Sequence, residues 1–172
     1  MAALPSGLPE HVADQEILAR HIFDRKQVRT ENGRSVLKAQ AFMPVQNDDG
    51  SWVLSVSRVS QCQDNAAIER NGTAVGKTGN PPRVLYAFTT IIAGQIRSVP
   101  VTDSSGLAIG KMDVVAEEPP PCHAHIVKYP DRIPGENPKE LQKDCAEDLA
   151  QRASDVTFRK LPLEPWEEEA TK

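Results

Sequence analysis

Two histidines separated by one residue, His123 and His125, are the first candidates for chemistry in this chain. Side chains two residues apart on a β-strand point to the same face, so the two imidazoles would lie side by side. Imidazoles in that arrangement can bind zinc, but a zinc site needs three or four ligands and Cys122 would point to the other face. We therefore expect no metal and no cofactor. One histidine should bond a loop carbonyl, and the other should lie at the surface.

The segment Ser55-Val56-Ser57-Arg58 is the second candidate. Its hydroxyls and its guanidinium, on or near one strand face, could hold a phosphate or a carboxylate. The alternative is an ordinary solvent-facing strand. Catalysis by a nucleophilic serine is not expected, because the glycine-framed turn that builds an oxyanion hole in hydrolases is absent around both serines. The candidate catalytic residues are therefore His123, Ser55 and Arg58, with Arg58 binding an anion and His123 moving a proton.

Two further patterns are weaker candidates. Glu117 and Glu118 could orient His123, but neighbouring strand residues face opposite ways, and such a pair is commonly a solvated strand end. The segment 72–78 has the glycines, lysine and threonine of a phosphate-binding loop. Three residues separate its glycines where that motif requires four, and no apolar strand precedes it. We expect no nucleotide-binding loop there.

Two strand-like segments, 52–59 and 123–129, must position the candidate residues. If they are antiparallel neighbours with Ser55 or Ser57 opposite His123, the paired Cβ atoms lie about 5 Å apart. The serine, Arg58 and His123 could then line one concave site. The positive charge of Arg58 would favour the neutral form of the His123 imidazole, which can act as a base. In the alternative arrangement these side chains face different surfaces and His123 is tied to a loop carbonyl.

Hydrophobic periodicity and turn residues predict the remaining elements. The clearest helix covers 137–153, where Leu141, Cys145 and Leu149 repeat every four residues after an Asn-Pro start. The other predicted elements are a short helix over 14–23, turns at 32–33 and 47–50, a strand over 36–44, a helix capped by Asp64 and weakened by Gly72, Gly76 and Gly79, a β-rich segment over 84–99 that breaks at Ala93-Gly94, a strand over 111–116, a polyproline link over 119–121 and an edge strand over 157–161.

Chain length and composition set the fold class. A chain of 172 residues is the usual size of one domain, and 39% hydrophobic residues with 14 prolines indicate short elements and many rigid loops. We predict a single α+β domain over 14–161, mainly an antiparallel sheet with two or three helices packed on it. A flexible lead over 1–13 precedes it, and an acidic tail over 162–172 follows it.

Charge and cysteine content narrow the partners and the compartment. The formal net charge of −4 does not favour nucleic acid, for which the basic N-terminal segment is the only candidate surface. The three cysteines have no metal or redox spacing, so free thiols in a reducing, cytoplasmic compartment are expected. No apolar run is long enough to span a membrane, and the first ten residues lack the features of a signal peptide.

The chain resembles a loosely defined group of small uncharacterised bacterial proteins without an established activity, in short blocks at 17–20, 41–44, 54–58 and 120–127. The resemblance implies a bacterial cytoplasmic origin and makes His123, Ser55 and Arg58 a possible shared cluster. It argues against His125 as a metal ligand. It implies no reaction.

Two functions from different classes follow. The favoured one is a partner-binding module or accessory subunit of a larger assembly, because no complete catalytic constellation is present. The alternative is a small enzyme that acts on a nucleotide or phosphorylated small molecule through Arg58, His123 and the serines. The expected partner is another protein, and the oligomeric state is left open.

Overall fold

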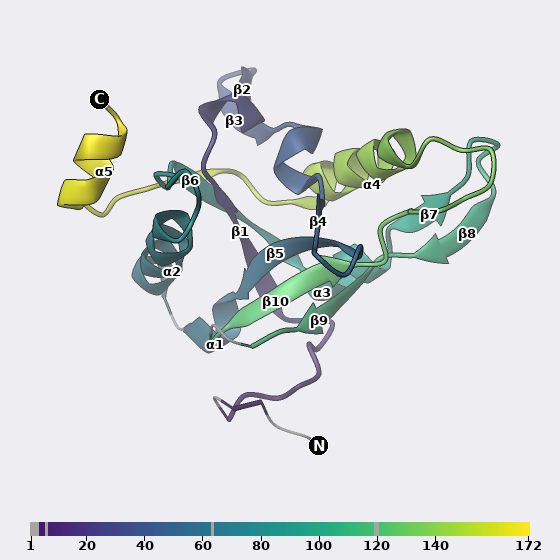
Figure 1. The fold of residues 1–172 in the computed structure, drawn as a ribbon, viewed down its shortest axis with the longest axis horizontal. Coiled ribbons are helices and arrows are strands. Elements are labelled where there is room, and N and C mark those ends of the chain that lie inside the picture. The colour runs from purple at the N-terminus through teal and green to yellow at the C-terminus, as the bar shows by residue number, and fades with distance from the viewer. Residues whose placement is uncertain (1–3, 6, 63, 119–120) are drawn as a thin grey trace.

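The computed structural model describes residues 4–5, 7–62, 64–118 and 121–172, and it has the predicted α+β fold (Figure 1). Its main sheet is antiparallel, in the order β11-β6-β1-β5-β10-β9, with β4 paired to the start of β5. The strands of this sheet are β1 (Ile17–Ile22), β4 (Val45–Gln46), β5 (Trp52–Arg58), β6 (Ala87–Ile92), β9 (Asp113–Ala116), β10 (His123–Val127) and β11 (Thr157–Phe158).

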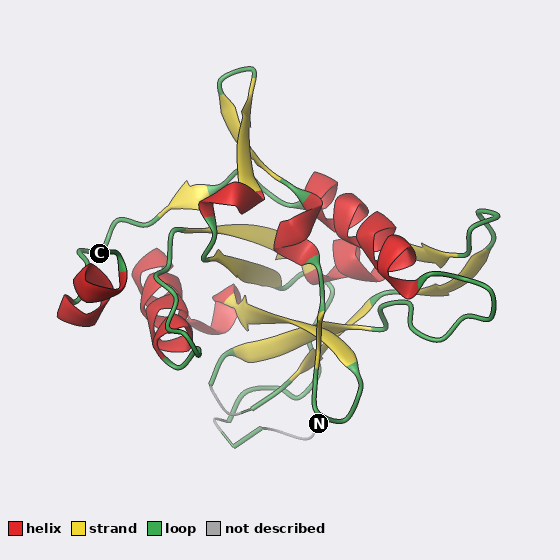
Figure 2. Ribbon diagram, turned by 45° about the horizontal axis from the view of Figure 1, so that its top comes forward, coloured by secondary structure: helices red, strands yellow, loops and turns green. Residues whose placement is uncertain are grey.

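Helices and two hairpins surround the sheet, and Figure 2 shows the hairpins projecting from it. The hairpins are β2 (Val28–Glu31) with β3 (Arg34–Leu37), and β7 (Pro100–Thr102) with β8 (Ala108–Lys111). The helices are α1 (Val59–Cys62), α2 (Asn65–Lys77), α3 (Ala93–Arg97), α4 (Pro138–Arg152) and α5 (Pro165–Ala170), with 3-10 turns η1 (Arg25–Gln27) and η2 (Ala39–Phe42). None of these described helices is long and apolar enough to cross a membrane.

The two faces of the sheet pack differently. The larger core joins Val56 of β5 to Phe42 of η2 and Leu149 of α4. On the opposite face a smaller cluster joins Ala19 and Phe88 to Ile68 of α2. Because side chains alternate along β5, Ser55 and Ser57 lie on the α2 face, while Arg58 lies on the larger core face. The two serine hydroxyls of β5 are therefore on the face of the sheet that α2 covers.

Several predicted elements are confirmed. Asn32-Gly33 forms the β2–β3 turn with both residues at positive φ, the conformation that glycine and asparagine adopt most cheaply. Helix α4 begins after Asn137, whose side chain accepts a hydrogen bond from the Lys139 N–H at 3.2 Å. Its buried face includes the three residues that the periodicity picks out. The edge strand predicted over 157–161 is present as the shorter β11 at one end of the main sheet, where it pairs with β6.

The helix predicted over 14–23 is wrong, because this segment contains the central strand β1. Leu18, Ala19, His21 and Ile22 are all buried, on both faces of the sheet. A strand buried on both sides loses its alternating pattern, and its apolar residues then imitate helical spacing. Periodicity alone therefore could not distinguish the two structures here.

Three other boundaries also differ from expectation. The strand predicted over 36–44 stops at Leu37 and gives way to η2. Helix α2 continues through Gly72 and Gly76 to Lys77, because tertiary contacts outweigh the weak helix propensity of glycine. The break at Ala93-Gly94 is real, but a helix, α3, follows it rather than a second strand. Most of the predicted polyproline link, Pro119-Pro120, lies outside the described residues.

Both terminal segments contact the rest of the domain. Val12 is 1% exposed and belongs to the larger core. At the other end Glu167 of α5 is buried and forms an ion pair with Arg159. Glu69 of α2 accepts a hydrogen bond from the Leu161 N–H at 2.8 Å. Val12 lies in the predicted lead over 1–13 and Glu167 in the predicted tail over 162–172, so each of these segments has a residue packed into the fold.

Candidate functional site

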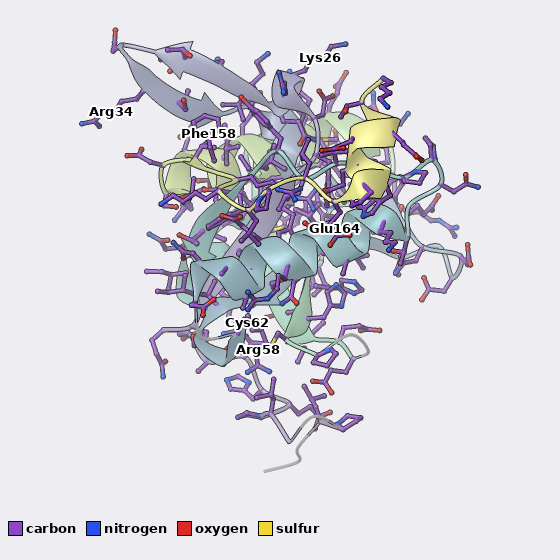
Figure 3. All side chains as sticks on the ribbon, turned by 90° about the vertical axis from the view of Figure 1, so that its left-hand side faces the viewer. Lys26, Arg34, Arg58, Cys62, Phe158 and Glu164 are labelled. Atoms are coloured by element: carbon purple, nitrogen blue, oxygen red, sulfur yellow. The ribbon has the colours of Figure 1, made fainter. Side chains whose placement is uncertain are left out.

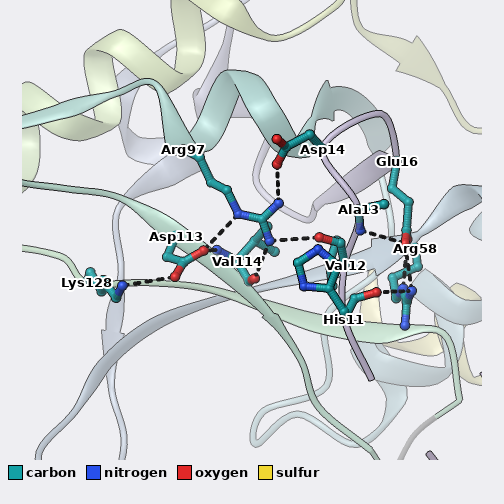
Figure 4. A network of polar contacts seen from close by, with 10 residues as sticks. All are labelled: His11, Val12, Ala13, Asp14, Glu16, Arg58, Arg97, Asp113, Val114 and Lys128. Carbon is teal, nitrogen blue, oxygen red and sulfur yellow. Dashed lines mark hydrogen bonds and ion pairs between the residues drawn. The ribbon is translucent and has the colours of Figure 1, made fainter. Parts of the chain in front are cut away.

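Arg58 does not join the predicted cluster. Its side chain is fully buried and forms two hydrogen bonds with Glu16, from Nε at 2.8 Å and from Nη2 at 2.7 Å. Nη1 donates to the Pro9 carbonyl at 2.7 Å, and Figure 4 shows the guanidinium held against the N-terminal segment. Strand alternation explains this placement, because Arg58 must face away from Ser57. Arg58 has a structural role, and its assignment to anion binding is corrected.

The serines and histidines do meet. In the pairing of β5 with β10, His123 lies opposite Ser57 and His125 lies opposite Ser55. The two imidazole rings are 4.6 Å apart between centroids and stand edge to face. Among the described residues no group of three or more histidine, cysteine or acidic side chains is arranged to hold a metal ion. The paired strands thus form a polar strip of two hydroxyls and two imidazoles.

His123 is held in one tautomer. Its Nδ1 lies 3.1 Å from the backbone carbonyl of Glu117, and since a carbonyl only accepts, Nδ1 must carry the proton. Burial, and then the neighbouring His125, lower the pKa of His123 below its usual range. A neutral ring with Nδ1 protonated has an unprotonated Nε2, which can accept a proton. The Glu117 carboxylate lies nearer His125, with 3.7 Å between Oε2 and Nδ1.

A pocket of about 700 Å³ lies between α2 and the strands that carry Ser57 and His123. We name it the His123 pocket. Its polar lining comes from four elements and their loops, and its apolar lining includes Phe23, Val45 and Val75. No described residue that lines it is acidic. The polar side chains that line it are those of Arg20, His21, Ser55, Ser57, Asn71, Thr78, Arg83 and His123.

Sequence reasoning counted Arg20 only as part of the basic N-terminal segment and did not place it in a site. β1 and β5 pair only through residues 18–19 and 57–58, and Arg20 follows where the two strands separate. Its Nε donates to the Ala41 carbonyl at 2.8 Å and its Nη1 to the Ser55 carbonyl at 3.3 Å. Among the described residues it forms no ion pair. Burial, and the like charge of Arg83, lower the pKa of Arg20 to about 10, so it stays charged at neutral pH.

Arg83 supplies the second positive charge. Its guanidinium stacks on the Phe23 ring, 4.7 Å from the ring centroid. Its backbone N–H donates to the Gly76 carbonyl at 2.9 Å, which ties the 80–85 loop to α2. A Cβ on Gly76 would lie 2.0 Å from the Arg83 carbonyl oxygen, so only glycine allows this approach. The glycines that imitate a phosphate loop in the sequence thus allow close packing of α2.

His21 also lines the His123 pocket, but one of its two ring nitrogens is already in a hydrogen bond. Its Nε2 bonds the Ile68 carbonyl at 3.0 Å, and burial lowers the pKa of His21 to about 4. The ring is therefore neutral at pH 7. Arg20 and Arg83 are left as the permanent charges of the His123 pocket.

A signal for Arg20 was present in the sequence but could not be interpreted there. Arg20 interrupts the apolar residues of 17–22, and a charge inside a buried strand indicates either an ion pair or a functional group. The predicted helix over 14–23 left Arg20 out of its apolar face, so Arg20 did not become a site candidate.

Searches against protein-family models, curated proteins and solved structures found no match for this chain.

Proposed function

We propose that this protein binds a small organic anion in the His123 pocket, with Arg20 and Arg83 holding the negative group and His123 accepting a proton from the ligand. The observation that carries the proposal is the state of Arg20. Arg20 is a partly buried cation that donates to two backbone carbonyls but has no carboxylate partner among the described residues. Such a cation costs free energy, and that cost is typical of a functional site. A bound anion would supply the missing charge.

The composition of the pocket agrees with this ligand class. The chain as a whole has a formal charge of −4, yet two arginines and no described acidic side chain line the His123 pocket. Such a local positive field attracts small anions in spite of the net charge. A volume of about 700 Å³ falls within the usual range for small-molecule sites.

The polar strip can also do chemistry. Among the described residues the hydroxyls of Ser55 and Ser57 make no hydrogen bond, so both can bind ligand atoms. His123 is neutral, and the Glu117 carbonyl fixes its orientation, the arrangement that general base catalysis requires. When His123 takes up a proton, the nearby ligand anion stabilises the imidazolium. An acid–base enzyme is therefore the function that the geometry favours over binding alone.

A thermal-shift panel tests the binding step. We expect phosphorylated and carboxylated small molecules to raise Tm and their neutral counterparts to leave it unchanged. A ligand at about 100 times its Kd stabilises by about 2.7 kcal/mol, which for a chain of this length is a rise of about 5–10 °C. Arg20→Met should abolish the rise. The control, Arg34→Met, removes the same charge from the exposed β2–β3 hairpin seen in Figure 3 and should preserve it.

The proton-transfer step is followed on the compounds that bind. Each is incubated with the protein in D₂O and monitored by ¹H NMR for exchange of a ligand proton or for new signals. Conversion by the wild type should fall by about 10²–10⁴-fold in His123→Asn, the usual contribution of a general base. A full panel without any Tm rise would contradict the binding site. Binding without any conversion would contradict the enzyme.

A further inference from the structure

A second pocket adjoins the first. It has a volume of about 660 Å³ and shares Arg20, Phe23 and Arg83 with the His123 pocket. The turn η1 supplies its other charged residues, Arg25 and Lys26, together with Asp24 just before it. We name it the Lys26 pocket. The three shared residues border both pockets and form the wall common to them, so a ligand group held at these residues adjoins both pockets.

The Lys26 pocket is strongly cationic. Four positive side chains and a single carboxylate, Asp24, line it. Asp24 is already engaged as the cap of η1, where its Oδ1 accepts from the Lys26 backbone N–H at 2.8 Å. Among the described residues none of the four cations forms an ion pair with a carboxylate. Four positive charges against the one negative charge of Asp24 leave this pocket with an excess of positive charge among the described residues.

Aromatic stacking holds two of these cations in place. The Arg25 guanidinium lies 5.1 Å from the centroid of the Tyr86 ring, and Arg83 lies 4.7 Å from that of Phe23. Stacking restricts a guanidinium while leaving its N–H groups at the edge free to donate. Planar donors that are fixed in advance bind phosphate oxygens better than flexible ones.

We propose that the ligand of the proposed function is a diphosphate ester, with its diphosphate in the Lys26 pocket and its uncharged body in the His123 pocket. This inference rests on the proposed function and specifies its substrate class. A carboxylate carries one charge and is satisfied by one arginine, whereas four clustered cations match a group with two or three charges. The body then lies beside the Ser57 hydroxyl and His123, where its proton can be removed.

Inorganic pyrophosphate and phosphate test the head-group site without requiring the body. By calorimetry at low ionic strength, pyrophosphate should bind the wild type about tenfold or more tightly than phosphate, since it contacts more cations. Removing two exposed charges in Arg25→Gln/Lys26→Gln should weaken pyrophosphate about tenfold and phosphate less than about threefold. Lys111→Gln/Lys139→Gln, with the same change in net charge on other elements, should change either affinity less than about twofold.

The outcomes separate this inference from the function on which it rests. If phosphate binds and Arg20→Met abolishes that binding, but pyrophosphate gains nothing over phosphate, the diphosphate assignment is overturned and the anion site stands. Equal losses in the Arg25/Lys26 and Lys111/Lys139 variants would also overturn it, as a general charge effect. If neither anion binds and the thermal-shift panel also fails, the proposed function itself is wrong.

Discussion

Replacing Arg58 by methionine should lower the free energy of unfolding by about 3–5 kcal/mol, as measured by chemical denaturation. The substitution keeps most of the buried volume but leaves the Glu16 carboxylate without its partner. It also removes the donor to the Pro9 carbonyl. Breaking a buried ion pair from one side is costly because an uncompensated charge stays inside.

A double variant and a pH series are the controls for this prediction. Glu16→Gln/Arg58→Met should be more stable than Arg58→Met alone, because it removes the stranded charge. Burial acts to raise the pKa of Glu16, but the hydrogen bonds from Arg58 and Ala13 hold it below its usual 4.5. The stabilisation is therefore complete above pH 4.5 and lost as the pH falls through the lower folded value. A loss under about 1 kcal/mol at pH 7 would show that Arg58 is not structural.

Gly76→Ala should lower the free energy of unfolding by about 2 kcal/mol despite the better helix propensity of alanine. The propensity gain is about 1 kcal/mol, and the overlap with the Arg83 carbonyl, at 2.0 Å, exceeds it. That carbonyl belongs to the backbone, so a side-chain rotation cannot relieve the contact. The loop that carries Arg83 must then move away from α2. Calorimetric unfolding measures the loss.

Gly110→Ala is the matched control for this substitution. Its added Cβ would meet nothing closer than the Val101 Cβ at 4.0 Å, an ordinary contact. We expect a change within about 0.5 kcal/mol. If Gly76→Ala proved as mild as Gly110→Ala, the close packing of α2 against the Arg83 loop would be contradicted.

The sequence predicted the paired part of the site well. The α+β class, the antiparallel sheet and helix α4 follow from turn residues and clear periodicity. The register that brings Ser57 opposite His123 was one of two stated arrangements, and the structure has it. His123 also bonds a loop carbonyl, which belonged to the other arrangement. Local patterns therefore predicted the polar strip of serines and histidines, but they did not predict which arginines lie beside it.

The arginines show what local patterns could not decide. Arg58 follows two serines and looks like their partner, yet strand alternation sends it to Glu16, 42 residues earlier in the chain. Arg20 interrupts an apolar run, which is a local signal, but it reaches the pocket because β1 and β5 separate, and that separation is a tertiary feature. The predicted helix over 14–23 hid both Arg20 and Glu16, the partner that holds Arg58 on the other face of β5. The protein partner and the cytoplasmic location stay predictions.

An anomalous diffraction map from crystals soaked in sodium tungstate tests the central claim most directly. Tungstate is a tetrahedral dianion that imitates phosphate and is located by its own scattering. We predict a peak at the wall between the two pockets, with its oxygens about 2.7–3.2 Å from the guanidinium nitrogens of Arg20 and Arg83. The peak should be absent in Arg20→Met crystals soaked in the same way. Tungstate bound only elsewhere on the surface would contradict an anion site at these arginines.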